Sequence, residues 1–92
     1  MKIVADLSLY PLKDGPIPDI IMFIEDLREQ TGIEIISNQL STQIRGEFDK
    51  VTGAINRCMA KTMDTSNTVV LVVKYLNIDV EIKQSPSLTP PL

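Results

Sequence analysis

The order of patterns along this 92-residue chain predicts an α+β fold of the form β-α-β-β-α-β. Three observations lead to this prediction. Four short runs have strand character, at 2–10, 33–36, 40–45 and 68–76. Two longer stretches repeat apolar residues at helical spacing, at 18–30 and 46–64. Prolines, glycines and small polar residues separate the six stretches, as expected where a chain turns.

The first strand is predicted over 2–10, because its residues alternate between two faces. One face is uniformly apolar, with Ile3, Ala5, Leu7 and Leu9. The other face is mixed, with Val4, Asp6, Ser8 and Tyr10. The segment 11–16 holds two prolines and a glycine, which is turn chemistry.

Two amphipathic helices are predicted. The helix over 18–30 has an apolar stripe of Ile20, Phe23, Ile24 and Leu27, and Gly32 suits the position after its last turn. The second helix is predicted to begin at Gly46, with acidic residues in its first turn, where the helix dipole favours negative charge. Its apolar stripe is Phe48, Val51, Ile55 and Met59, flanked by Ala54 and Cys58.

A β-hairpin is predicted between the two helices, with strands at 33–36 and 40–45. Alternation directs Leu40 and Ile44 to the core, with Thr42 between them, and a hydroxyl in that position needs a hydrogen-bond partner. The opposite face carries Ser41, Gln43 and Arg45.

The run 68–76 is apolar on both faces as far as Lys74, which predicts a central strand covered on both sides. Residues 78–82 alternate and predict a short fifth strand along an edge. The domain is therefore assigned to 1–82. Residues 83–92, with three prolines among the last seven, are predicted to be a disordered tail.

Right-handed crossovers place both helices on one face of a four-stranded antiparallel sheet, the ferredoxin-like arrangement. The opposite, open face has no predicted cover within the chain, although one edge of the run 69–73 is too apolar to face water. We therefore predict a homo-oligomer, a dimer or tetramer, that packs through the open face.

Composition excludes several classes of function. The net charge is −3 and the nine basic residues are scattered, which argues against a nucleic-acid partner. The chain has no histidine and one cysteine, so neither a metal site nor histidine-dependent catalysis is predicted, and no cofactor is expected. Cys58 is interpreted as a small core residue. No run of 18 apolar residues exists, so membrane insertion is not expected and a cytoplasmic location is predicted.

Short motifs then carry a resemblance to a known family. They are Ser8-Leu9-Tyr10-Pro11-Leu12, Leu40-Ser41-Thr42, Arg45-Gly46 and Phe48-Asp49-Lys50-Val51. In this order and at these places the chain resembles the YkoF-type thiamine and hydroxymethylpyrimidine binding proteins, over residues 3–76. That family has a ferredoxin-like domain, in tandem in some members and single in others, and a single domain would be expected to associate.

The resemblance implies a function and a site. The function is binding of thiamine or its hydroxymethylpyrimidine moiety without catalysis, as a carrier or sensor in thiamine uptake or salvage. The implied pocket residues are Ser8, Tyr10, Leu40, Ser41 and Thr42, to which we add Asn38 from its place in the adjoining turn. Hydroxyls and an amide can both donate to and accept from an aminopyrimidine. Many single-domain relatives have Glu where this chain has Arg45, so a role for an acid there is not transferred.

Other interpretations of the same residues stay open. The segment 37–39 is also ordinary hairpin-turn chemistry, and Tyr10 also suits strand-end packing. Asp6 and Arg45 are candidates for an ion pair between two sheets. For the whole protein, the alternative is an oligomeric structural or regulatory module of the same fold without a thiamine ligand. An acylphosphatase would need a Gly-rich phosphate loop, and the four glycines are well separated.

Overall fold

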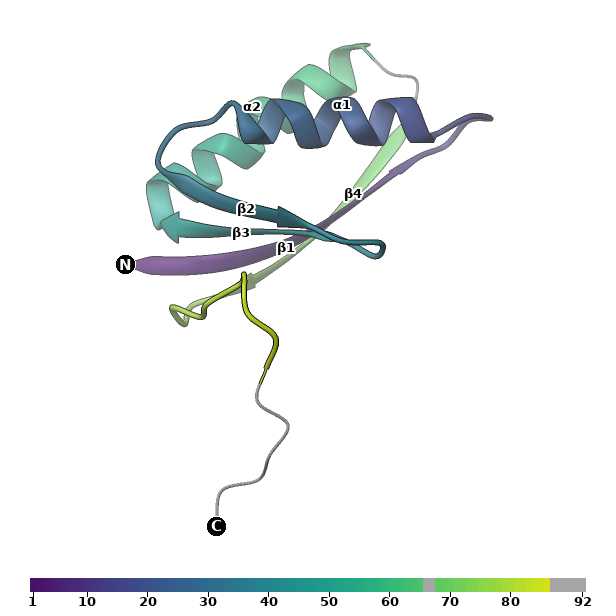
Figure 1. The fold of residues 1–92 in the computed structure, drawn as a ribbon. Coiled ribbons are helices and arrows are strands. Elements are labelled where there is room, and N and C mark those ends of the chain that lie inside the picture. Colours follow the sequence, from purple (N-terminus) through teal and green to yellow (C-terminus); the bar gives the residue numbers. More distant parts are fainter. Residues whose placement is uncertain (66–67, 87–92) are drawn as a thin grey trace.

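The computed structural model describes residues 1–65 and 68–86, and it has the predicted ferredoxin-like order of elements. Its strands and helices are β1 (Lys2–Pro11), α1 (Ile17–Arg28), β2 (Ile33–Ser37), β3 (Thr42–Glu47), α2 (Phe48–Thr65) and β4 (Val69–Leu76). All pairings are antiparallel, in the order β2-β3-β1-β4. Both helices lie on one face of the sheet, as predicted (Figure 1).

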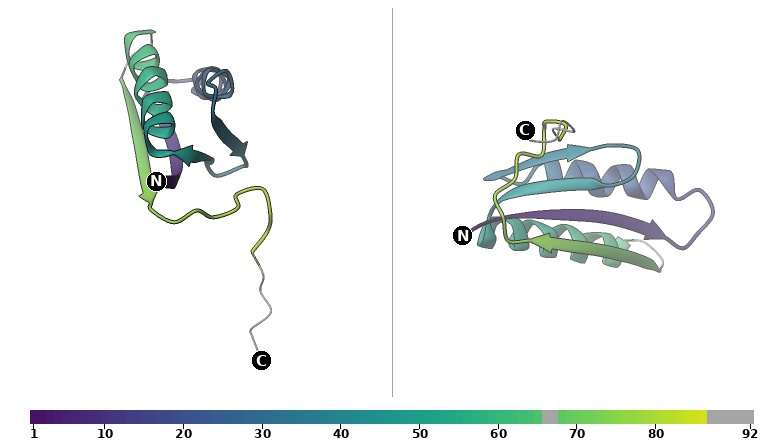
Figure 2. Two further views of the ribbon diagram at one scale, coloured as in Figure 1. Left: turned by 90° about the vertical axis from the view of Figure 1, so that its left-hand side faces the viewer. Right: turned by 90° about the horizontal axis from the view of Figure 1, so that it is seen from below.

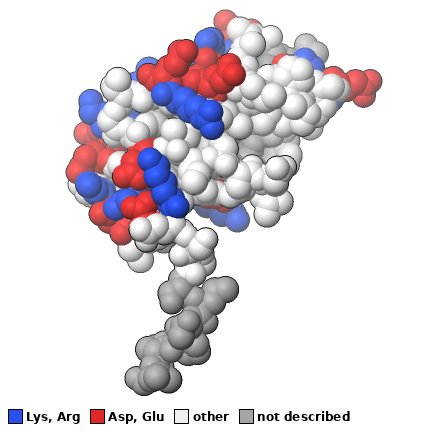
Figure 3. All heavy atoms as spheres, in the orientation of Figure 1, with Lys and Arg blue, Asp and Glu red and all other residues white. Residues whose placement is uncertain are grey.

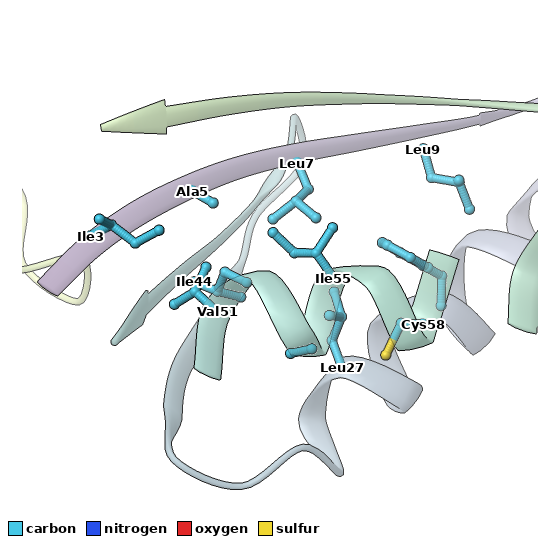
Figure 4. Close-up of a cluster of buried hydrophobic side chains, with 11 residues drawn as sticks. Ile3, Ala5, Leu7, Leu9, Leu27, Ile44, Val51, Ile55 and Cys58 are labelled. Carbon is cyan, nitrogen blue, oxygen red and sulfur yellow. The ribbon is translucent and has the colours of Figure 1, made fainter. Parts of the chain in front are cut away.

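The core lies between the sheet and the two helices (Figure 4). Ile3, Ala5, Leu7 and Leu9 of β1 form the predicted apolar face and are buried. They meet the buried side chains Phe23, Leu27, Ile44, Val51, Ala54, Ile55 and Cys58. Each large aliphatic side chain buried in this way contributes about 1.5–3 kcal/mol. Burial raises the pKa of the Cys58 thiol, which fits the interpretation of Cys58 as an unreactive core residue.

The predicted start of the third strand is wrong by two residues. Leu40 lies in the turn and is 88% exposed, and β3 begins at Thr42. The cause is Asn38, whose Oδ1 accepts hydrogen bonds from the N–H groups of Leu40 (2.9 Å) and Ser41 (3.1 Å). The Asn38 N–H also donates to the carbonyl of Ser41 (3.0 Å), so the turn runs from 38 to 41.

The second helix begins at Phe48 instead of Gly46. Gly46 belongs to β3, where it lies between Ile3 and Ile33, and a Cβ at this position would stand 3.0 Å from the carbonyl oxygen of Gly32. Phe48 is substantially exposed, so the predicted stripe was wrong there. The buried stripe of α2 is Val51, Ala54, Ile55, Cys58 and Thr62.

β4 is an edge strand and not the predicted central one. Leu71 and Val73 pack against the core, whereas Val70 and Val72 are 44% and 43% exposed on the open face. A run that is apolar on both faces is expected to be covered on both faces, but this pattern does not distinguish a central strand from an edge strand.

The predicted fifth strand is absent from the described residues, because 77–86 contain no strand or helix. Seen from below, this segment leaves β4 and runs across the open face (Figure 2). We call residues 77–83 the strap. Arg45 holds it: its Nε donates to Asp79 Oδ1 (2.7 Å) and its Nη1 to Glu81 Oε2 (2.9 Å). One end of the open face is therefore covered within the chain, contrary to prediction. Residues 87–92 of the predicted tail lie outside the described residues.

Candidate ligand-binding site

The six predicted site residues all line one pocket of about 270 Å³, which lies between α1 and the end of the β2–β3 hairpin. Six further residues, which sequence reasoning did not select, complete the lining. The full set is Leu7, Ser8, Leu9, Tyr10, Ile17, Ile20, Ile24, Asn38, Gln39, Leu40, Ser41 and Thr42. The volume lies just below the range typical of pockets for drug-sized ligands.

The pocket exists because β1 is longer than its pairing with β3. β1 pairs with β4 as far as Pro11, but its pairing with β3 stops at Leu7 opposite Thr42. The N–H of Leu12 donates to the carbonyl of Thr68, just beyond the ends of β1 and β4. Because the peptide groups of an antiparallel strand point alternately to either side, this bond implies that the N–H and C=O of Leu9 point away from β4. Within the described residues they have no strand partner. Leu9 therefore presents a backbone donor and acceptor towards the hairpin turn.

Thr42 is buried on the helix side of β3, and its hydroxyl has the partner that the sequence demanded. That partner is Ser37 on β2, directly opposite, with 2.7 Å between Ser37 Oγ and Thr42 Oγ1. Either oxygen can be the donor in this contact, so one of the two O–H groups remains to donate elsewhere. Ser37 does not line the pocket but holds the hydroxyl of Thr42, and sequence reasoning did not select it because its position suggested a turn.

Asn38 Oδ1 accepts two hydrogen bonds from the protein, and Ser41 Oγ accepts one. Asn38 Oδ1 accepts the two backbone N–H groups of the turn, which leaves its amide nitrogen as the atom that can recognise a ligand. Ser41 Oγ accepts from Gln43 Nε2 (2.7 Å), and that nitrogen also donates to Asp6 Oδ1 (3.0 Å). The hairpin side of the pocket is consequently rich in hydrogen-bond donors.

The remaining walls are apolar. Ile17, Ile20 and Ile24 come from α1, and Leu7 and Leu9 come from the core face of β1. Strand alternation directs the side chains of Ser8 and Tyr10 to the open face, so these two border the pocket at the strand edge. Tyr10 is 53% exposed there. None of the twelve lining residues is charged.

The interpretation of Asp6 and Arg45 as partners in an ion pair receives no support from the described chain. Asp6 accepts from Gln43, and Arg45 is committed to Asp79 and Glu81 with Glu34 3.5 Å away. The described residues contain no group of three potential metal ligands among His, Cys, Asp and Glu. Neither described helix has the length and apolar character that crossing a membrane requires.

Comparison with known families gives a match along most of the chain. The model described as the YKOF-related family matches residues 2–80. The chain belongs to the YKOF-related family. The match includes every pocket residue, and it agrees with the resemblance found in the short motifs.

Solved structures share the fold. A protein from Streptococcus pneumoniae is 26% identical with a TM-score of 0.78, covering 90% of this chain and 91% of its own. A hypothetical protein from Methanocaldococcus jannaschii is 20% identical with a TM-score of 0.71, covering 95% and 88%. A Thermotoga maritima protein, whose name assigns it provisionally to thiamine biosynthesis or salvage, is 15% identical with a TM-score of 0.74, covering 90% and 92%. No curated protein sequence matches the chain.

Proposed function

We propose that this protein binds thiamine or its hydroxymethylpyrimidine moiety without catalysis, as a carrier or sensor in thiamine uptake or salvage in the cytoplasm. The observation that carries the proposal is the meeting of the five motif-derived residues, with Asn38 from the adjoining turn, in one pocket, although they come from two separate parts of the chain. Membership of the YKOF-related family supports it. The name of the Thermotoga maritima structure points to the same vitamin.

The chemistry of the pocket suits a small heteroaromatic ring. The ring nitrogens of an aminopyrimidine are acceptors, and they match the O–H of Ser41, the amide nitrogen of Asn38 and the free O–H of the Ser37–Thr42 pair. The exocyclic amine is a donor, and the Leu9 carbonyl is an available acceptor. The isoleucines of α1 and the leucines of β1 pack on the faces of the ring.

The expected affinity is modest. Thiamine has roughly 18 non-hydrogen atoms, and at ~0.3–0.4 kcal/mol per atom the binding free energy is about 5–7 kcal/mol. This corresponds to a Kd of roughly 0.01–0.2 mM. Such a value fits reversible carriage or sensing.

Thr42→Val tests the site, because valine has the shape of threonine without the hydroxyl. The exchange removes the contact with Ser37, which costs about 0.5–1.5 kcal/mol of stability, and we expect it to weaken pyrimidine binding about tenfold or more in calorimetric titration. Thr62→Val is the matched control, since Thr62 is a buried threonine of α2 outside this pocket. Equal affinity of Thr42→Val and the wild-type protein would remove Thr42 from the site.

We also propose that the protein is a homo-oligomer, a dimer or tetramer joined through the open face. Tyr10, Val70 and Val72 are neighbours there by register and all are exposed. The strap covers only the end near Arg45, so this apolar area is left for a second copy. A two-fold interface would pair the area with itself.

Light scattering tests the assembly. We expect a mass above that of the monomer at micromolar concentration, and we expect Val72→Lys to reduce it to the monomer, because a charge would then be buried in the contact. Met63→Lys is the control, since Met63 is comparably exposed on α2. A monomeric mass for the wild-type protein would reject the proposal. If the protein is only an interaction module, Ser41→Ala and Thr42→Ala will change nothing beyond stability.

A further inference from the structure

A short chain of hydrogen bonds connects the open face of the sheet with the pocket. Gln43 of β3 lies opposite Asp6 of β1, and its Nε2 donates to Asp6 Oδ1 (3.0 Å) and to Ser41 Oγ (2.7 Å). Ser41 lines the pocket, whereas Asp6 and Gln43 do not. In Figure 3 the surface around the hairpin end and the first turns of α1 is uncharged, and no charged residue lines the pocket. The charge of Asp6 therefore reaches this uncharged pocket through one neutral side chain.

We infer that Asp6 and Gln43 are positioning residues, which fix the Ser41 hydroxyl as a hydrogen-bond donor towards a ligand in the pocket. This inference rests on the proposed function, because such a donor serves a ligand whose ring nitrogens accept hydrogen bonds. Neither Asp6 nor Gln43 contacts the ligand in this role. Both act through the direction of a single O–H bond.

The carboxylate of Asp6 decides which way round the Gln43 amide lies. An ionised carboxylate only accepts hydrogen bonds, whereas a carboxamide has a donor nitrogen on one side and an acceptor oxygen on the other. Turning the amide over would place Gln43 Oε1 where Nε2 now stands, so that two acceptor oxygens would face each other across the 3.0 Å contact. That orientation loses the hydrogen bond and leaves a buried side of both groups without a donor. Asp6 therefore holds Nε2 towards itself.

The orientation of the Gln43 amide in turn decides the direction of the Ser41 hydroxyl. A hydroxyl can donate or accept, and its hydrogen rotates to suit its neighbours. Because Ser41 Oγ faces Gln43 Nε2 at 2.7 Å, the oxygen has to accept, and its own hydrogen points away from Gln43. This O–H donates to no other described residue, so it is available to a ring nitrogen of the ligand. With the amide reversed, Ser41 would donate to Gln43 Oε1 and turn a lone pair towards the ligand instead.

A double substitution reverses this direction while it keeps the shape and the net charge of the site. In Asp6→Asn/Gln43→Glu, here called the exchange variant, the amide stands at position 6 and the carboxylate at position 43. The amide can donate to the carboxylate, so the contact between β1 and β3 is kept with its polarity reversed. Ser41 then faces an acceptor and donates to it, which turns its hydrogen away from the ligand. We expect the affinity for hydroxymethylpyrimidine to fall about two- to tenfold, the value of one hydrogen bond.

The test is calorimetric titration of the full chain with hydroxymethylpyrimidine, for the exchange variant with and without the Ser41 hydroxyl. In Ser41→Ala the hydroxyl is absent, so adding the exchange should cause no further loss of affinity. Side chains that only support the fold would lower the affinity equally in both backgrounds. Denaturant unfolding measures stability separately, and we expect the exchange variant to keep the unfolding midpoint of the wild-type protein, because the hydrogen bonds it removes are replaced.

The outcomes separate the positioning role from the proposed function. A loss of affinity that depends on the Ser41 hydroxyl would support the role. If the wild-type protein binds hydroxymethylpyrimidine, then unchanged affinity in the exchange variant, full affinity in Ser41→Ala, or an equal loss in both backgrounds would overturn the positioning role alone. Asp6→Asn, which allows both orientations of the amide and should cause a smaller loss, decides in the same way if the exchange variant does not fold. Absence of heat with the wild-type protein would reject the proposed function and the positioning role together.

Discussion

Individual residues of the hairpin turn have two roles that the sequence could not separate. The need of Thr42 for a partner was predictable from alternation, and the partner is Ser37. The exposure of Leu40 was not predictable, because it depends on the two hydrogen bonds that Asn38 Oδ1 accepts. Asn38 belongs to the turn, as the alternative interpretation held, and it also lines the pocket.

Two substitutions of Asn38 distinguish these roles. Asn38→Ala removes the acceptor of both turn hydrogen bonds, so we expect the free energy of unfolding to fall by about 1–2 kcal/mol and pyrimidine binding to weaken. Asn38→Asp keeps an oxygen acceptor but removes the amide donor, and it should retain most of the stability while still losing affinity. Denaturant unfolding and titration measure the two effects. Full affinity in Asn38→Asp would assign Asn38 to the turn alone.

At the scale of elements, periodicity predicted all six strands and helices but not how each is placed. Gly46 was predicted to open a helix, and it lies instead in β3 at a point where two strands approach closely. The run 68–76 was predicted as a central strand, and β4, which it contains, lies at the edge. Both errors have the same origin: a pattern reports which faces are apolar, whereas neighbours and close approaches depend on distant parts of the chain.

Two glycines give opposite predictions for the same substitution. Gly46→Ala would place a Cβ 3.0 Å from the backbone oxygen of Gly32, so the strands must shift and we expect a loss of about 1–3 kcal/mol. Gly53→Ala, within α2, meets only the far end of the long Arg57 side chain, whose Nη1 would lie 2.9 Å from the new Cβ and can shift aside, and it should stabilise the protein by about 0.5–1 kcal/mol. Thermal or denaturant unfolding compares them. A gain of stability in Gly46→Ala would contradict the close approach.

Across the whole molecule, the strap is the feature that the sequence described least well. Residues 78–82 alternate between apolar and acidic side chains, as a strand would, but this segment crosses the open face. Its position there depends on its charged side chains. Arg45 lies on β3 and pairs with Asp79 and Glu81 from the strap, besides Glu34 from β2. The sequence alone did not show that these acids, more than 30 positions away, would meet Arg45.

The strap should loosen in acid. The hydrogen bond from Arg45 lowers the pKa of Asp79, and the backbone N–H of Lys83, with Arg45, lowers the pKa of Glu81. A lowered carboxyl pKa gives a stabilisation that is present above the ordinary pKa and lost as pH falls through the lowered pKa. Below pH ~4 we therefore expect smaller amide protection factors at 79–83, with each exchange rate compared to the intrinsic rate at the same pH. Arg45→Gln should have the same effect at neutral pH, and Lys61→Gln, whose partner is Asp26 on α1, should not. Protection that is unchanged in Arg45→Gln would mean that the ion pairs do not hold the strap.

The most direct test of the account is calorimetric titration of protein that has been unfolded and refolded to remove any carried-over ligand. We expect saturable binding of hydroxymethylpyrimidine, near one ligand per chain, with a Kd of roughly 0.01–0.2 mM. Together with a lower affinity of Thr42→Val for hydroxymethylpyrimidine, such a result would establish the pocket between α1 and the hairpin as a vitamin-precursor site. The absence of binding by either hydroxymethylpyrimidine or thiamine up to millimolar concentration would contradict the account and leave an interaction module of the same fold.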